Sequence, residues 1–148
     1  MKIEWQTKEF TQLSTLEMFE VLKLRQQVFV VEQNCAYPDI DNHDKTSIHL
    51  LGRNQAGEVY AYLRILPPRS DEFVRIGRVV TCEALRGQKF GKELMTRGLA
   101  YIDKEFKNHK IKISAQEHLQ IFYGAYGFIT TSEPYDEDGI LHVEMIRP

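Results

Sequence analysis

Apolar and polar residues along the N-terminal part of the chain predict a short strand followed by a helix. Residues 2–7 alternate with a period of two, and the stretch from Ser14 to Glu17 has the spacing of a capping box at a helix start. The helical pattern is interrupted at Gln26 and gives way over residues 31–45 to a polar stretch that predicts a long loop. The apolar face expected for this helix consists of Leu16, Phe19, Leu22, Val28 and Phe29.

Three further strands are predicted in the middle of the chain. Residues 47–53 and 59–66 flank a polar, glycine-containing connection over residues 54–58, which favours an antiparallel hairpin. A polar turn over residues 67–72 then leads into a longer β-branched strand over residues 73–82.

Helical and strand patterns alternate after this strand. Apolar residues recur at helical spacing from Phe90 to Phe106, which predicts an amphipathic helix. A short strand is predicted over residues 111–114, followed by a helix within residues 115–128 that Gly127 is placed to end.

The chain is predicted to close with two strands, over residues 128–133 and 141–147, around a turn at residues 134–139. The sequence contains no internal repeat, low-complexity tract or linker between domains. We therefore expect a single domain over residues 1–148 with mixed helices and strands.

Composition and charge exclude several classes of protein. The 148 residues are 43% hydrophobic, which is enough for a core, and the net charge of -2 provides no global field for nucleic acid or an anionic membrane. No apolar run approaches the ~20 residues that cross a bilayer, and the first ten residues lack a secretory signal, which favours the cytoplasm. Cys35 and Cys82 are too few for a disulfide framework and receive no role.

The junction between the long strand and the following helix, Leu-Arg-Gly-Gln-Lys-Phe-Gly-Lys over residues 85–92, is a candidate anion site. A helix N-terminus carries unpaired backbone N–H groups and partial positive charge, and glycines allow close approach of a phosphate. Gly87 and Gly91 are separated by three residues and Glu93 follows Lys92, so the stretch is not a P-loop. It also lacks the first glycine pair of a dinucleotide-binding fingerprint.

Two landmarks resemble the GNAT acetyltransferases. The pyrophosphate loop of that family has the pattern Arg/Gln-x-x-Gly-x-Gly/Ala, which Arg86, Phe90 and Gly91 fit, with Lys89 in the place of the middle glycine. A downstream Tyr-x-x-x-Gly-Phe pattern is matched by Tyr123, Gly127 and Phe128. Four longer stretches are similar to the ElaA-type branch of that family, namely residues 29–44, 84–95, 115–128 and 135–142. A lysine inside the loop is typical of that branch.

The resemblance implies an α/β (α+β) fold with a mixed, mostly antiparallel central sheet flanked by helices. It also implies a strand-loop-helix site for the pyrophosphate of acyl-CoA, and no metal. Tyr123 is the residue that the resemblance assigns to protonating the leaving thiolate, since a tyrosine keeps its proton at neutral pH. The residues that it assigns to the co-substrate are Val79, Val80, Thr81, Arg86, Gly87, Gln88, Lys89, Phe90, Gly91, Lys92 and Gln116.

The group that deprotonates the acceptor stays open at this point. The side chains chemically able to do so are Glu32, His49, Glu117, His118 and His142, with a water chain as the alternative. The spacing of Asp39, Asp41 and His43 suggests a calcium loop, but the sixth and twelfth positions are Asp44 and Leu50, which excludes an EF-hand. We interpret this acidic stretch as a solvated loop that lines the acceptor cleft and favours a cationic amine.

The expected function is an acyl-CoA-dependent N-acyltransferase, with acetyl-CoA as donor and direct transfer to a small-molecule or peptide amine in a ternary complex. The alternative is a non-catalytic module that senses CoA or acyl-CoA. The amine and the preferred acyl chain length are not specified by the sequence, because loops set them in this fold. Edge strands at the C-terminal end could pair two copies as a homodimer.

Overall fold

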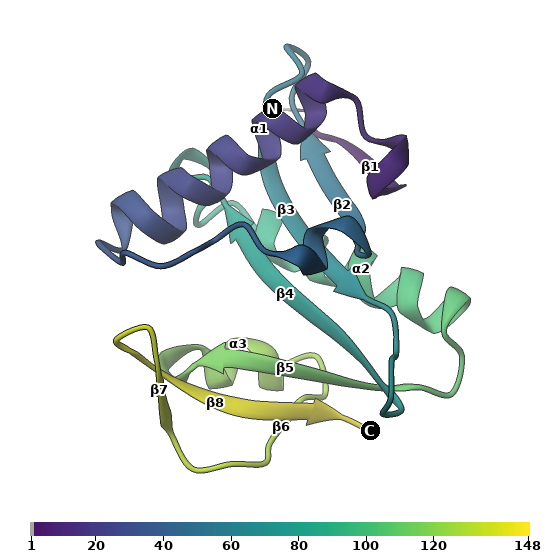
Figure 1. Cartoon of the computed structure of the whole chain (residues 1–148), viewed down its shortest axis with the longest axis vertical. Coiled ribbons are helices and arrows are strands. Elements are labelled where there is room, and N and C mark those ends of the chain that lie inside the picture. The colour runs from purple at the N-terminus through teal and green to yellow at the C-terminus, as the bar shows by residue number, and fades with distance from the viewer. Residues whose placement is uncertain (1) are drawn as a thin grey trace.

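The computed structural model describes residues 2–148, in which eight strands form one sheet (Figure 1). The strand order is β1-β2-β3-β4-β5-β8-β6, and β7 also pairs with β8. All neighbouring strands are antiparallel except β4 and β5, which are parallel. The strands are β1 (Glu4–Glu9), β2 (Ile48–Arg53), β3 (Val59–Leu66), β4 (Phe73–Thr81), β5 (Lys110–Gln116), β6 (Ile129–Thr130), β7 (Tyr135–Glu137) and β8 (Ile140–Arg147).

Helices cover both faces of the sheet. The helix α1 (Thr15–Arg25) crosses one face, and α2 (Phe90–Glu105) and α3 (Gln120–Gly124) lie on the other (Figure 1). Two hydrophobic clusters result: Leu94 and Leu99 of α2 belong to the larger cluster, and Val21 of α1 belongs to the smaller. Burying apolar side chains on both faces stabilises the central strands. Within the described residues, no helix has the length and apolar character needed to cross a membrane.

The apolar face predicted for the first helix is wrong in part. Leu16 and Phe19 are 64% and 59% exposed. The side chains that face the sheet include two charged residues, Glu17 and Arg25, because each has partners of opposite charge in the fold. The side chains of α1 and its continuation that are buried are Glu17, Val21, Leu24, Arg25 and Val28.

Both local signals at the ends of this helix are confirmed. Ser14 accepts a hydrogen bond from the Glu17 backbone N–H at 3.0 Å, and the Glu17 carboxylate accepts one from the Ser14 N–H at 2.8 Å, which is the predicted capping box. The interruption predicted at Gln26 marks the change from α-helix to a π-helical segment, Gln26–Glu32. Such wide turns are frequent at functional sites.

Two segments near the C-terminus differ from the prediction. The fifth strand runs to Gln116, because it pairs continuously with β8 as far as the pair Gln116 and His142. The helix predicted within residues 115–128 is therefore shorter, with a 3-10 turn before α3. Within the predicted turn at residues 134–139, the structure has the strand β7 and a tight turn at Asp138 and Gly139.

Candidate functional site

A cleft opens where β4 and β5 diverge. The two parallel strands pair only from Phe73 to Arg75 on β4 with Lys110 to Lys112 on β5. Beyond these pairs the strands separate (Figure 1), and the remaining part of β4, from Ile76 to Thr81, lines a cavity of about 680 Å³. Backbone groups on this side of β4 are therefore available to an extended ligand.

A β-bulge in β4 shapes the cleft wall. The register of β3 with β4 passes from Tyr62 with Val80 to Arg64 with Gly77, so β4 has one extra residue between these pairs. Arg78 lies in the bulge with φ +53°, a left-handed conformation that is uncommon for a residue with a side chain. The bulge bends the strand next to the predicted Val79–Thr81 segment, and all three of these residues line the cavity.

The predicted phosphate loop contains two residues in the left-handed backbone conformation. It runs from a 3-10 turn into the N-terminus of α2, with Gly87 at φ +81° and Lys89 at φ +66°. Lys89 thus adopts the conformation that favours glycine at the position where the family usually has one, and its side chain stays available for an anion. Arg86 and Gly91 line the cavity, whereas Gly87, Gln88, Lys89 and Lys92 are outside its lining on the exposed rim. Phe90, half-buried, begins α2.

Arg86 joins the loop to the opposite wall of the cleft. One of its Nη atoms lies 2.6 Å from a carboxylate oxygen of Glu32, at the end of the π-helical segment, and also donates to the Thr81 carbonyl at 3.2 Å. The Glu32 carboxylate raises the pKa of the Arg86 guanidinium, which is charged in any case. A bound phosphate would therefore compete with Glu32 for Arg86.

Tyr123 of α3 lines the same cavity and is otherwise buried. Its ring packs edge-on against Phe122 and Phe128, with centroid distances of 5.0 and 6.1 Å. Burial raises the pKa of the Tyr123 hydroxyl to about 12, so this group keeps its proton at neutral pH. The position and protonation both suit the role that the resemblance assigns to it.

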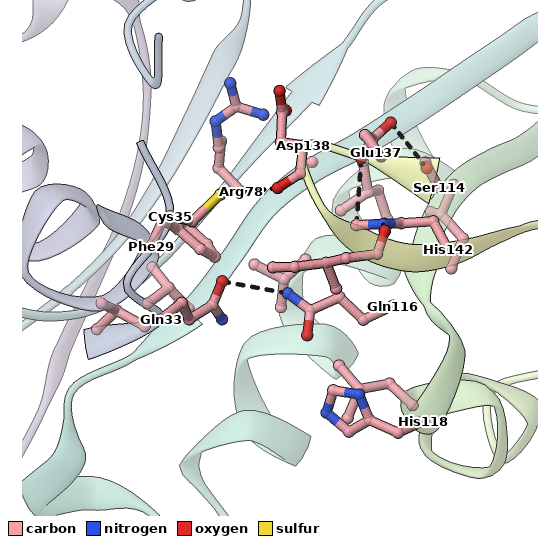
Figure 2. Close-up of a pocket in the computed structure, with 18 of the residues that line it drawn as sticks. Phe29, Gln33, Cys35, Arg78, Ser114, Gln116, His118, Glu137, Asp138 and His142 are labelled. Atoms are coloured by element: carbon pink, nitrogen blue, oxygen red, sulfur yellow. Dashed lines mark hydrogen bonds and ion pairs between the residues drawn. The ribbon is translucent and has the colours of Figure 1, made fainter. Parts of the chain in front are cut away.

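Gln116 and three of the five base candidates reach the cavity. Gln116 lies at the end of β5 and donates to the Gln33 side chain at 3.3 Å across the cleft (Figure 2). The candidates that line the cavity are Glu32, His118 and His142. Glu117 is outside the lining.

His49 is not a candidate base in this fold. It is fully buried, and Nε2 donates to the carbonyl of Asp44 at 2.9 Å while Nδ1 accepts from the Tyr62 hydroxyl at 2.6 Å. Burial lowers the pKa of the His49 ring, which therefore remains neutral and structural.

The interpretation of residues 39–44 as a solvated acidic loop is wrong. Asp39 and Asp44 are buried, and Arg25 contacts both, at 2.9 and 2.7 Å. Arg64 contacts Asp41 and Asp44, and Arg78 contacts Asp39. These arginines neutralise the carboxylates, so the acidic side chains hold the loop in place beside the cleft. They are not free to bind a cationic amine. We call Arg25, Asp39, Asp41, Asp44, Arg64 and Arg78 the ionic cluster.

Because of the ionic cluster, we expect the folded protein to lose stability in acid. Hydrogen bonds from Arg64 lower the pKa of Asp41 to about 2. Because the pKa is lower in the folded state, the stabilisation is present above the unfolded value of about 4 and is lost as the pH falls towards 2. The urea midpoint of the protein should fall over this range, and Asp41→Asn should make the fall shallower. Asp136→Asn, a change on exposed β7, should leave the fall of the urea midpoint with pH as steep as in the wild type. If the fall were as steep in Asp41→Asn as in the wild type, the expectation would be contradicted.

Several cavity residues were missed by the sequence prediction. Gln33 and Cys35 come from the stretch predicted to be a long loop, and Glu137 and Asp138 from the predicted turn (Figure 2). Tyr37, from the same predicted loop, also lines the cavity. The Cys35 thiol donates to the Asp138 carbonyl at 3.2 Å, which links the two segments over the cleft. The Asp-Gly pair is the signal that could have indicated a tight hairpin and therefore a strand on each side of it.

The chain is similar to known proteins over nearly its whole length. The family described as acetyltransferase (GNAT) domain matches residues 15–147. Protein ElaA of Escherichia coli (strain K12) is 46% identical over 148 residues, which cover 98% of this chain and 96% of that protein. A UPF0039 protein of Synechocystis is 41% identical over 99% of this chain and 96% of the relative.

Solved structures agree with these sequence matches. The crystal structure of Escherichia coli ElaA superimposes with a TM-score of 0.93 at 45% identity, covering 99% of this chain and 100% of that one. An acyl-CoA N-acyltransferase from Pseudomonas aeruginosa gives a TM-score of 0.94 at 41% identity, with the same coverage. The predicted fold, a mostly antiparallel mixed sheet between helices, is confirmed. The chain therefore belongs to the GNAT acetyltransferase family.

Proposed function

We propose that the protein transfers an acyl group, acetyl in the first instance, from acyl-CoA directly to an amine. The observation that supports this most is that one cavity collects three features from distant parts of the chain. These are the loop at the start of α2 with Arg86 and Gly91, the unpaired edge of β4 and the protonated Tyr123. The family and the name of the Pseudomonas aeruginosa structure agree with an acyl-CoA donor.

The loop and β4 would hold the co-substrate. The N-terminus of α2, a 16-residue helix, presents backbone N–H groups and partial positive charge to a pyrophosphate. Arg86, Lys89 and Lys92 add charge, and Arg86 suits bidentate contact with phosphate oxygens. The backbone of Val79 to Thr81 can pair with the amides of the pantetheine arm and donate to the thioester carbonyl.

The chemistry requires a neutral amine at the thioester carbonyl and a proton for the departing thiolate. Tyr123 can donate that proton because burial keeps its hydroxyl protonated. The cavity lining also includes the apolar side chains of Leu94, Ile113 and Phe122, which pack in the same hydrophobic cluster as Tyr123. Exclusion of water by these side chains would disfavour hydrolysis of the thioester.

The test is an assay of free thiol release from acetyl-CoA with a panel of acceptors: primary alkylamines, aralkylamines, polyamines, amino acids and short peptides. Thiol release that depends on one class of amine, with a product heavier by one acetyl group, is the expected result. A CoA sensor would instead show a thermal shift with acetyl-CoA and no thiol release with any amine. No thermal shift would contradict both functions.

Glu32→Gln should strengthen CoA binding. This change removes the partner of Arg86, so Arg86 no longer has to leave an ion pair to contact phosphate. Exposed ion pairs contribute about 0.2–1 kcal/mol, and the dissociation constant of CoA should fall by up to about fivefold. Calorimetric titration measures it, with Glu20→Gln on the α1 surface as a control. A kcat reduced 100-fold would instead identify Glu32 as the base.

A further inference from the structure

The cavity wall made by β5, β7 and β8 brings Glu137 and His142 together. The two-residue turn at Asp138 and Gly139, with φ +53° and +84°, has the backbone of a tight hairpin in which both central residues are left-handed. Across this hairpin Glu137 pairs with Ile140, so Glu137 and His142 are diagonal neighbours on one face. The turn therefore fixes the separation of the two side chains.

Each side chain of the pair is held by further contacts (Figure 2). His142 Nε2 lies 3.1 Å from Glu137 Oε2, and the Ser114 hydroxyl donates to Glu137 Oε1 at 3.3 Å. The ring of Tyr135 stacks on the His142 ring with an interplanar angle of 25°. The His142 side chain is 10% exposed and that of Glu137 is 48% exposed, so Glu137 is the member that an incoming molecule meets.

The hydrogen bonds of His142 determine which of its nitrogens is basic. Its Nδ1 lies 2.7 Å from the backbone carbonyl of Ile140, which can only accept, so Nδ1 carries a proton. The remaining nitrogen, Nε2, faces a Glu137 oxygen, which is also an acceptor when ionised. A proton on either group is therefore shared between them. A proton that reaches Glu137 from the cavity can pass to His142 Nε2.

We propose that Glu137 takes the proton from the acceptor amine and that His142 is the positioning residue that receives it. This inference rests on the proposed function and names a base that the motif analysis did not include. Both side chains line the cavity that Tyr123 lines. An alkylamine enters as an ammonium ion at neutral pH, and an ionised carboxylate at the cavity surface suits that charge.

The proton balance of the step is complete with these residues. The ammonium gives one proton to Glu137, from which it passes to His142 Nε2 and later to solvent. The neutral amine forms the C–N bond at the thioester carbonyl as the C–S bond breaks. Sulfur leaves with its electron pair and takes the proton of Tyr123. The second proton of nitrogen then restores Tyr123, and the products are an amide and a free thiol.

Other titratable or charged groups surround the pair. Tyr135 of β7, Asp138 of the turn and Cys35 lie beside it, and Arg78 of β4 is paired with Asp39. Lys112 of β5 and Glu144 of β8, further along the same face, pair with each other at 3.7 Å. Because these cations have carboxylate partners of their own, Glu137 is left to pair with His142.

Glu137→Gln tests the catalytic role. With the alkylamine of the panel that gives the highest rate, kcat at pH 7 should fall about 100-fold, the lower range for a positioned base. The loss should shrink towards pH 9.5, where more of the amine arrives neutral. Glu133→Gln, which removes the same charge from the exposed segment before β7, should remain within twofold of the wild type. The thermal shift with CoA should be unchanged in both variants.

His142→Asn tests the positioning role, because its amide can still donate to the Ile140 carbonyl while the atom facing Glu137 is gone. This variant should lower kcat by up to about 100-fold in the presence of Glu137 and should add no further loss to Glu137→Gln, because the effects of residues that act in one step are not additive. If Glu137→Gln does not lower kcat, or lowers it equally at every pH, the inference is overturned. Thiol release by the wild type would in that case still support the transferase. A loss from His142→Asn that is equally large in the presence and in the absence of Glu137 overturns the transfer to His142. No thiol release by the wild type with any amine overturns the proposed function and the inference together.

Discussion

Replacement of Arg25 by methionine is expected to lower the free energy of unfolding by about 3–5 kcal/mol, the usual cost of removing one partner of a buried ion pair. Arg25 is 0% exposed and donates to the Asp39 carboxylate at 2.9 Å, to the Asp39 carbonyl at 2.7 Å and to the Asp44 carboxylate at 2.7 Å. Although burial disfavours the charged guanidinium, its hydrogen bonds and attraction to Asp44 and Asp39 outweigh burial and raise the pKa of Arg25. Methionine has a volume similar to that of arginine, but the substitution leaves the buried carboxylates of Asp39 and Asp44 short of positive charge.

Urea unfolding at pH 7 measures this change, and an exposed pair provides the control. Arg75 contacts Asp71 at 2.6 Å with both side chains more than a third exposed, so Arg75→Met should cost at most about 1 kcal/mol. Adding Asp44→Asn to Arg25→Met should recover part of the loss, since one uncompensated charge is then removed. If Arg25→Met were as stable as Arg75→Met, the ionic cluster would not stabilise the fold.

The ionic cluster also connects stability to the site. Arg78 lies in the β4 bulge beside the cavity, and its guanidinium contacts Asp39 and lies 5.4 Å from the ring centre of Tyr37. Arg25 contacts the same aspartate from α1. The cluster therefore fixes the segment after α1 against β4 beside the cleft. A functional site that depends on a loop needs such support from rigid elements.

Sequence patterns predicted the elements whose signals are local. The capping box at Ser14, the helix from Phe90 and the hairpin of β2 and β3 are confirmed, because each depends on neighbours in the chain. The buried face of α1 was predicted from apolar spacing alone and is wrong in part. No periodicity can show that Arg25 finds aspartates 14 and 19 residues later in the chain, so its burial is a property of the tertiary fold.

The same distinction applies to the candidate site. The loop from Arg86 to Gly91 was identified because its backbone requirements are encoded in consecutive residues. The cleft itself depends on the early end of pairing between β4 and β5, which is a relation between strands far apart in the sequence. Glu137 was missed for the same reason, since its importance comes from a contact with His142 across a hairpin and with Ser114 of another strand.

Tyr123→Phe is expected to lower kcat about 1,000-fold, within the range of a positioned general acid, while the dissociation constant of CoA stays within twofold. Phenylalanine keeps the ring that packs edge-on against Phe122 and Phe128, so the fold and the cavity wall should be preserved. Only the hydroxyl is lost, and with it the proton for the thiolate. Because burial raises the pKa of Tyr123 to about 12, the wild-type kcat should show no fall from loss of this proton up to about pH 10.

The matched control is Tyr126→Phe, three residues further along the chain, just after the end of α3 and outside the cavity lining. Tyr126 lies 5.5 Å from Phe122 between ring centres, so both substitutions remove a hydroxyl from the same aromatic group. Thiol release by Tyr126→Phe should remain within twofold of the wild type. If Tyr123→Phe also retained its turnover, the proton would have to reach sulfur from water, and burial of the hydroxyl would then serve packing alone. A loss in Tyr123→Phe that is matched by weaker CoA binding would instead indicate that the hydroxyl holds the co-substrate.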